Sequence, residues 1–199
     1  MGLIDVTEQR PELTFRQRWS HYLVLIWGII AMFIGINLRD SVLNATTIYS
    51  NPQAGITAAY PANWLLDETG DYIFRVQDMS RIGFKTTLQV AARPVSVSTT
   101  TRNVLDALNL SRSQVLAAYE VLSEEPFVLP DESQAIAMTY TYVDTEANPF
   151  LQGIPVVVEG VDILTIKRGQ AIIITLLSDA ATFADNRIIL DQFLQSLEF

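Results

Sequence analysis

The sequence contains no cysteine, one histidine (His21) and two lysines (Lys85 and Lys167) in 199 residues. Without cysteine there are no disulfides, thiolate zinc sites, iron–sulfur clusters or cysteine nucleophiles. A Ser-His-Asp triad needs an imidazole beside its serine, and no histidine follows residue 21. We therefore expect no catalytic residue, no metal site and no bound cofactor in this chain.

Positive charge is also scarce. The chain has 13 Lys and Arg residues against 22 Asp and Glu, a formal net charge of -9. A nucleic-acid partner needs a basic face to meet its phosphates, so this class of partner is excluded. Residues 55–199 carry nine of the basic and eighteen of the acidic residues, a balance that repels acidic partners and steers basic ones.

Formal charge is absent from residues 19–38, whose sequence is WSHYLVLIWGIIAMFIGINL. At about 1.5 Å per residue, a helix of this length crosses the roughly 30 Å hydrocarbon layer. The competing interpretation is a signal peptide, whose apolar region is about 7–15 residues long and precedes a small-residue cleavage site. Here the run is longer and is followed by Asn37, Leu38, Arg39 and Asp40. We expect an uncleaved transmembrane helix in the lipid bilayer.

The flanking charges predict the orientation of this helix. Arg10, Arg16 and Arg18 precede it, whereas Arg39 is the only basic residue after it until Arg75. By the positive-inside rule, residues 1–18 form a cytoplasmic leader and the C-terminal domain is extracytoplasmic. His21 then lies at the membrane interface as an ordinary polar residue.

One face of the helix carries small residues. Gly28, Ala31 and Gly35 are three and four residues apart, which places them close to one face and permits close approach by another helix. We predict that this face packs against an integral membrane subunit.

The rest of the chain predicts a linker over 39–54 and one α+β domain over 55–199. Apolar and polar residues alternate as in strands, or recur at helical spacing, in separate stretches. We expect strands at 56–60, 72–78, 85–94, 119–123, 134–143, 155–167 and 171–178, and helices at 102–110, 111–120 and 181–196. This order favours an antiparallel sheet with helices packed on its faces.

Carboxylates are the remaining candidates for chemistry. Glu159 and Asp162 interrupt an apolar strand, and Glu124, Glu125, Asp131 and Glu132 surround the loop at 126–130. Their spacing does not match a calcium-binding loop. We interpret them as a solvated rim and turns.

An apolar pair in a loop is a candidate partner contact. Phe150 and Leu151 follow Asn148 and Pro149, two residues typical of turns. Such apolar side chains either dock on a partner or fold back into their own core.

Two stretches resemble PsbP-like domains. Residues 48–50 (IYS) and 55–64 (GITAAYPANW) are similar to the opening of these domains, a short strand ending in Tyr-Pro-x-x-Trp. Residues 188–199 (IILDQFLQSLEF) are similar to their ending, a helix leading to a short hydrophobic strand. The resemblance implies an α/β/α sandwich, which these domains share with a nuclear-import accessory protein of the Ran system. It also implies a non-catalytic role in supporting membrane complexes, photosystem II among them.

The favoured hypothesis is that the protein is a non-catalytic accessory or structural subunit of a membrane complex. The resemblance implies that this complex is a bacterial respiratory or photosynthetic electron-transfer complex. Its partners are then integral membrane subunits. The alternative is a membrane-tethered extracytoplasmic module that binds a small molecule or protein. An enzyme would have only carboxylate, lysine or tyrosine chemistry and is the least favoured class.

Topology gives the first prediction. Protease added to intact cells, or to spheroplasts where an outer membrane is present, digests residues 40–199 and spares the leader, because the arginines hold the N-terminus inside. Immunoblotting of the two ends measures this. Digestion of the leader with survival of the domain contradicts the charge argument.

Overall fold

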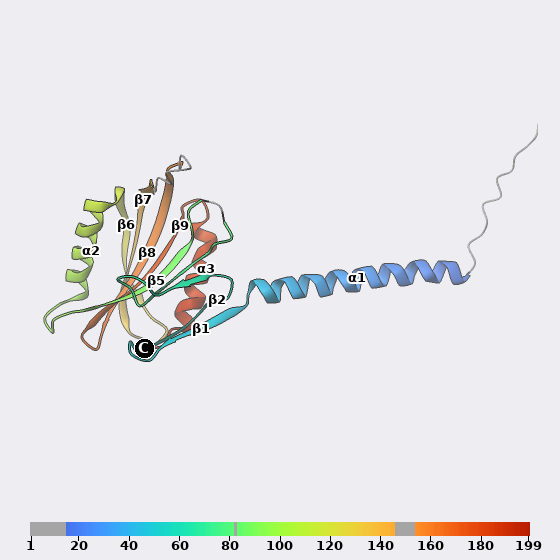
Figure 1. Ribbon diagram of the computed structural model, residues 1–199, viewed down its shortest axis with the longest axis horizontal. Helices are drawn as coiled ribbons and strands as arrows, with labels where there is room; N and C mark the ends of the chain where they lie inside the picture. Colours follow the sequence, from blue (N-terminus) through green and yellow to red (C-terminus); the bar gives the residue numbers. More distant parts are fainter. Residues whose placement is uncertain (1–14, 82, 146–153) are drawn as a thin grey trace, which may run out of the picture. The chain divides into compact units, whose positions relative to one another are not determined.

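The computed structural model describes residues 15–81, 83–145 and 154–199. The chain divides into two units, Met1–Ala45 and Thr46–Phe199. The described part of the first unit is one helix, α1 (Phe15–Leu43), which contains the predicted span (Figure 1). Its stretch Trp19–Val42 is long and apolar enough to cross a membrane, and none of it is buried.

The predicted linker at 39–54 consists mostly of regular structure. Helix α1 continues to Leu43, and strand β1 (Thr46–Asn51) begins after Asn44 and Ala45. The amide of Asn44 donates to the carbonyl of Asp40 at 3.0 Å, which closes the helix end. Strand β1 pairs antiparallel with β2 (Ile56–Pro61), and this pairing satisfies the backbone of residues 46–51 within the predicted linker.

The second unit is built on a seven-stranded sheet in which all neighbours are antiparallel. Its order is β3-β4-β5-β9-β8-β7-β6. The strands are β3 (Leu65–Asp67), β4 (Phe74–Gln77), β5 (Thr87–Pro94), β6 (Ala117–Val128), β7 (Gln134–Asp144), β8 (Val156–Lys167) and β9 (Gln170–Asp179). The predicted hairpin of β8 and β9 turns at Arg168 and Gly169, whose φ values of 50° and 74° are typical of a tight hairpin turn.

Two helices accompany the sheet. Helix α2 (Thr101–Val115) is capped by Thr100, whose side-chain oxygen accepts from the amide of Asn103 at 3.2 Å. Helix α3 (Phe183–Ser196) precedes the C-terminal residues, and Thr57 pairs with Glu198 as a short bridge. The α+β fold expected from the sequence is confirmed.

The second helix predicted at 111–120 is wrong in its C-terminal half. Helix α2 ends at Val115, and β6 starts at Ala117, with Ala118 at a φ of 51°. Strand β6 is also much longer than the predicted 119–123, because it pairs along β7 as far as Val128. Pairing with a strand later in the chain overrides the local helical spacing.

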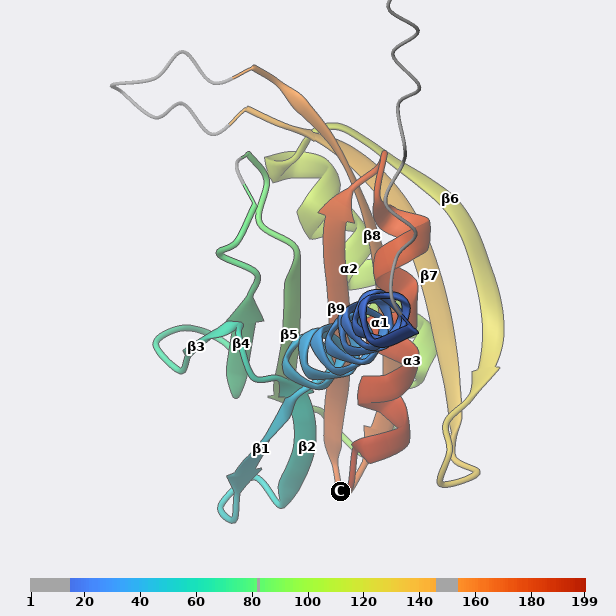
Figure 2. The ribbon, with the colours of Figure 1, turned by 90° about the vertical axis from the view of Figure 1, so that its right-hand side faces the viewer.

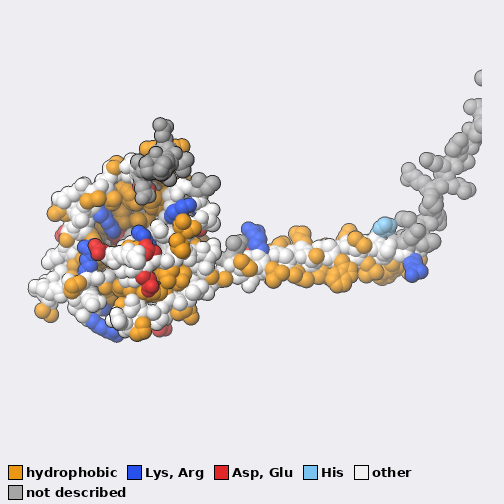
Figure 3. Space-filling view, in the orientation of Figure 1, with side chains coloured by type: hydrophobic (Ala, Val, Ile, Leu, Met, Phe, Trp, Pro, Cys, Tyr) orange, Lys and Arg blue, Asp and Glu red, His pale blue; other side chains and the backbone are white. Residues whose placement is uncertain are grey.

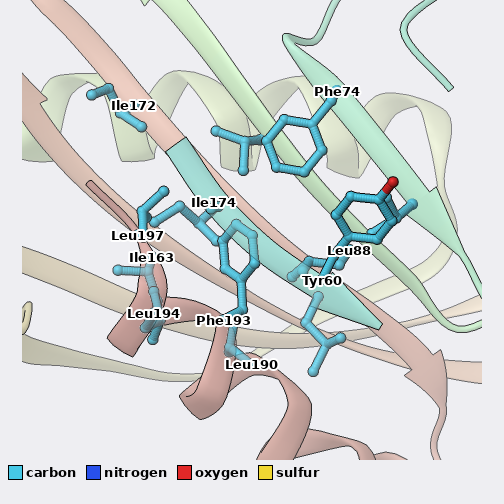
Figure 4. Packing of buried hydrophobic residues seen from close by; sticks show 14 of the residues in the cluster. Tyr60, Phe74, Leu88, Ile163, Ile172, Ile174, Leu190, Phe193, Leu194 and Leu197 are labelled. Atoms are coloured by element: carbon cyan, nitrogen blue, oxygen red, sulfur yellow. The ribbon is translucent and has the colours of Figure 1, made fainter. Parts of the chain in front are cut away.

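Side chains alternate between two cores, one on each face of the sheet. Along β8, Val161 and Ile163 join α3, β1 and β2, whereas Val158 and Leu164 join α2. Figure 2 shows α3 in front of the sheet and α2 behind it. In Figure 4, Leu190, Phe193 and Leu194 of α3 lie over Ile163 and Ile174 of the sheet. The domain is therefore an α/β/α sandwich.

Gly160 fits the α2 side of the sheet because it has no side chain. A Cβ built at this position would lie 2.6 Å from Cζ of Tyr140 and 2.8 Å from Cδ2 of Leu177. Tyr140 is 1% exposed, so it has little room to move. The glycine lets the tyrosine ring lie flat across β8.

Gly160→Ala is expected to lower the free energy of unfolding of the domain by about 1–3 kcal/mol, since it overfills a close-packed core. Chemical denaturation followed by tryptophan fluorescence measures the loss. Gly28→Ala is the matched control, because nothing lies within 4 Å of a Cβ added there. Equal stability of the two variants contradicts the prediction.

Candidate functional site

Helix α1 presents an apolar surface that the described residues of its own unit do not bury. Every side chain described between Phe15 and Val42 is exposed, and hydrophobic side chains extend along its length (Figure 3). The large exposed ones are Phe15, Trp19, Tyr22, Leu23, Val24, Leu25, Ile26, Trp27, Ile29, Ile30, Met32, Phe33, Ile34, Ile36, Leu38 and Val42. A helix of this length and composition is a membrane anchor or a signal sequence.

The residues predicted to pack against another helix lie on this surface. Nothing lies within 4 Å of a Cβ added at Gly28 or Gly35, so the chain itself does not occupy the space beside them. Ala31 and His21 are likewise exposed. The packing face stays a prediction. Phe150 and Leu151, the other predicted contact, lie outside the described residues.

The domain contains one deeply buried ion pair, between Arg112 of α2 and Asp162 of β8. Asp162 is 0% exposed and the Arg112 side chain 19%. Thr175 of β9 donates to Oδ1 of Asp162 at 2.7 Å, and the Arg112 guanidinium lies 4.4 Å above the Tyr140 ring. The sequence indicated a solvated rim at Asp162, and this expectation is wrong. The Asp162 side chain faces the α2 layer, where Arg112 supplies a counter-charge.

Burial and the neighbouring charges shift the pKa values of Arg112 and Tyr140. Burial by itself lowers the pKa of Arg112, but the charge of Asp162 outweighs it and the net pKa is raised. Burial raises the pKa of Tyr140 well above its usual value of 10.0, and Asp162 adds to the effect. A general acid or base needs a pKa near the working pH. Arg112 and Tyr140 are thus unsuited to proton transfer near neutral pH, and the Arg112–Asp162 pair holds α2 on the sheet.

The other predicted carboxylates serve separate local roles. Glu124 of β6 forms an ion pair with Arg102 of α2 at 2.5 Å. Asp131 forms an ion pair with Lys167. The hydrogen bond from Lys167 is the main cause of the low pKa of Asp131, about 2. Burial raises the pKa of Glu159, and the charge of Arg187 partly offsets this. Glu125 and Glu132 are exposed.

Sequence reasoning missed a second polar cluster, at the β3–β4 turn. Asp67 accepts from Thr69, Tyr72 and Arg75, and these bonds, led by the Thr69 hydroxyl, hold its pKa well below the usual range. The four residues are close in sequence, so a turn signal existed. Over residues 15–81, 83–145 and 154–199, no group of three or more His, Cys, Asp or Glu side chains is placed to hold a metal ion.

A pocket of about 260 Å³ lies between the end of β5 and α2. Val95, Val104 and Leu108 supply apolar lining, with Arg93 and Asn103 among the polar residues. The volume is below the roughly 300–1,000 Å³ of typical small-molecule sites.

This architecture has a counterpart among solved structures. The solution structure of cyanobacterial PsbP (CyanoP) from Synechocystis sp. PCC 6803 matches with a TM-score of 0.56 and 16% sequence identity, over 77% of this chain and 92% of that chain. PA94 of Pseudomonas aeruginosa, described as a protein of unknown function and putative regulator, matches at 0.49 and 12% identity, over 78% and 98% of the two chains. A Bacteroides thetaiotaomicron structure matches at 0.47 and 10%, over 76% of this chain and 47% of its own.

No protein-family model matches the sequence, and no curated protein matches it. At these identities the likeness shows the fold alone. The protein is of the class that combines an apolar N-terminal helix with a domain of PsbP-like fold.

The Arg112–Asp162 pair predicts an asymmetric response to mutation. Arg112→Leu leaves a fully buried carboxylate unpaired and is expected to cost about 3–5 kcal/mol of unfolding free energy. Asp162→Leu costs less, because Arg112 is partly exposed and can turn toward water. The double variant recovers most of the Arg112→Leu loss. Denaturant unfolding of all three measures this, and equal losses in both single variants contradict it.

Proposed function

We propose that this protein is a non-catalytic accessory subunit of a bacterial membrane complex, anchored by α1 with its N-terminus in the cytoplasm and its domain outside. The observation that carries the proposal is the exposed apolar surface of α1 joined to a PsbP-like domain. Exposure to water of this 24-residue stretch, in which most residues are apolar, is strongly unfavourable, so its surface requires lipid or other helices around it.

Retention of α1 as an anchor is supported by the short connection to the domain. Only Asn44 and Ala45 separate α1 from β1, and β1 is paired along its length with β2. The cleavage site of a signal peptide directly follows the apolar region, and here this stretch is the end of α1 followed by the paired strand β1. Phe150 and Leu151 are the proposed domain contact with the complex, by the sequence argument given above.

A non-catalytic role is supported by the electrostatics of the domain. Asp162 is neutralised by Arg112, and Asp131 by Lys167. The host class, a respiratory or photosynthetic electron-transfer complex, rests on the resemblance to PsbP-like domains. In such a complex the cofactors belong to neighbouring subunits.

A second candidate function is a tethered binding module. The pocket between β5 and α2 favours it, because its apolar lining and the Arg93 guanidinium are suited to a small apolar anion. Its volume leaves room for only a small ligand.

The test is gentle solubilisation of native membranes followed by native electrophoresis and spectroscopy. The protein is expected to co-migrate with integral membrane subunits, and its deletion to lower the yield of that complex with unchanged cofactor spectra. Migration as a free monomer overturns the proposal and favours the binding module. Loss of one haem or flavin signal from an intact complex contradicts a purely structural role.

The same preparation tests the anchor face. Ala31→Leu with Gly35→Leu is expected to weaken co-migration severalfold, because the larger side chains prevent close helix approach. Ile30→Leu with Ile34→Leu is the matched control on the same turns and leaves co-migration unchanged. If both double variants behave alike, the predicted face is not a contact.

A further inference from the structure

Part of the sheet face that carries α3 has no helix of the same unit over it among the described residues of Thr46–Phe199. On this face α3 lies over β8 and β9, and β1 and β2 extend the cover toward β4 and β5. In Figure 2, much of β7 and β6 lies to the right of α3, and of the two helices of this unit it is α2, on the opposite face, that accompanies them. We call this uncovered part the β6–β7 strip.

The register of the strands identifies the side chains of the strip. The side chain of Asn186 in α3 donates a hydrogen bond to Ser178 of β9. Across the sheet, Ser178 lies opposite Glu159 of β8. The same row continues to Thr141 of β7 and then to Glu120 of β6. Opposed residues in an antiparallel pair point to the same face. This row therefore begins under α3 and ends in the strip.

Two further rows have the same arrangement. Leu176 and Val161 belong to the core under α3, and their row continues to Thr139 and then to Ser123 of β6. The next row runs from Ile163 through Ala137 to Glu125. The strip thus has a floor of Ala137, Thr139 and Thr141, all half-buried, and a rim of exposed Glu120 and Glu125.

The strip is negatively charged. Glu159 borders it on the α3 side, so Glu120, Glu125 and Glu159 are arranged around the small residues of the floor. Arg187 of α3 is the cation that acts on Glu159, and the two do not form an ion pair among the described contacts. The carboxylates exceed the positive charge here, which favours a basic occupant.

The dimensions of the strip fit one helix. Neighbouring strands lie about 4.8 Å apart, so β6 and β7 span about 10 Å. This is close to the diameter of one helix with its side chains, about 10–12 Å. Small floor residues permit close approach, and α3 provides a neighbour against which a second helix can lie.

Addition of a partner strand at the free edge of β6 is less favourable. The register of β6 shifts between Ala117 and Glu120 and again between Val121 and Ser123, and Pro126 has no amide hydrogen to donate. Bulges and proline are the features that protect sheet edges from strand pairing.

We propose that the β6–β7 strip is the docking surface for a basic amphipathic helix of another subunit of the complex. The helix would add a second helix to the α3 layer and place Lys or Arg side chains against Glu120 and Glu125. This inference rests on the proposed function, since it names a second surface, besides Phe150 and Leu151, through which the accessory subunit holds a partner.

The test places a photo-crosslinking amino acid at Thr139 of the full-length protein in native membranes, and identifies the crosslinked peptide by mass spectrometry. Gln114, exposed on α2 at the other face of the sheet, is the control position. We expect a crosslink from Thr139 to a net-positive helical segment of a different chain, with a yield that falls as ionic strength rises.

Charge reversal tests the recognition directly. Glu120→Lys with Glu125→Lys is expected to lower the crosslink yield about tenfold or more, because like charges then face each other. Asp71→Lys with Glu132→Lys makes the same total change of charge at exposed positions outside the strip and leaves the yield unchanged. Lys-to-Glu changes in the identified segment restore the yield with the strip variant.

The failures of the two proposals are distinguishable. A protein that migrates as a free monomer contradicts the accessory-subunit function. A protein that stays in its complex but gives no crosslink from Thr139 overturns the docking surface alone. A crosslink to a second copy of this chain, to its own residues 1–14 or 146–153, or to an acidic segment also overturns it, as does equal yield from the strip and control charge variants.

Discussion

The two central strands of the sheet need cover on both faces, and the rest of the domain is arranged around this need. Residues 171–176 of β9 are buried without interruption, and so are residues 160–165 of β8. A strand buried on both faces reads as a continuous apolar run rather than as an alternating one. Each face therefore requires its own layer, which α3 with β1 and β2 supplies on one side and α2 on the other.

The two layers are attached in different ways. Helix α3 buries Phe183, Leu190, Phe193 and Leu194 and is held by apolar contact. Helix α2 buries fully only Leu105, so its position depends more on the Arg112–Asp162 pair and on the Arg102–Glu124 pair. A buried ion pair adds little net stability, but it fixes which groups must meet. The pair thus sets the register of α2 over β8.

Internal pairing uses most of the scarce positive charge of the domain. Ion pairs engage Arg75, Arg81, Arg102, Arg112 and Lys167, five of the nine basic residues after position 55. Glu120 and Glu125, which form none of these ion pairs, face solvent. The surface of the domain is therefore more acidic than an even distribution of the charges would make it. This acidity favours a positively charged partner.

The sequence by itself determined the features that depend on local pattern. The apolar run at 19–38 specified the long helix. A helix formed from it is apolar on all sides and has no polar face to expose to water. Alternation along 134–143 and the turn at 168–169 specified β7 and the β8–β9 hairpin, and the Tyr-Pro-x-x-Trp stretch indicated the fold. Within the predicted linker, residues 46–51 form a strand because they pair with β2, and the local pattern alone does not specify this partner.

Tertiary structure alone decided the site. Asp162 and its counter-charge Arg112 are 50 residues apart, so no spacing in the sequence indicates that they meet. The length of β6 depends on β7, and the uncovered β6–β7 strip depends on where α3 crosses the sheet. A residue pattern reports which face of an element is apolar, but the neighbour that covers the face is selected when the chain folds, because burial is non-directional.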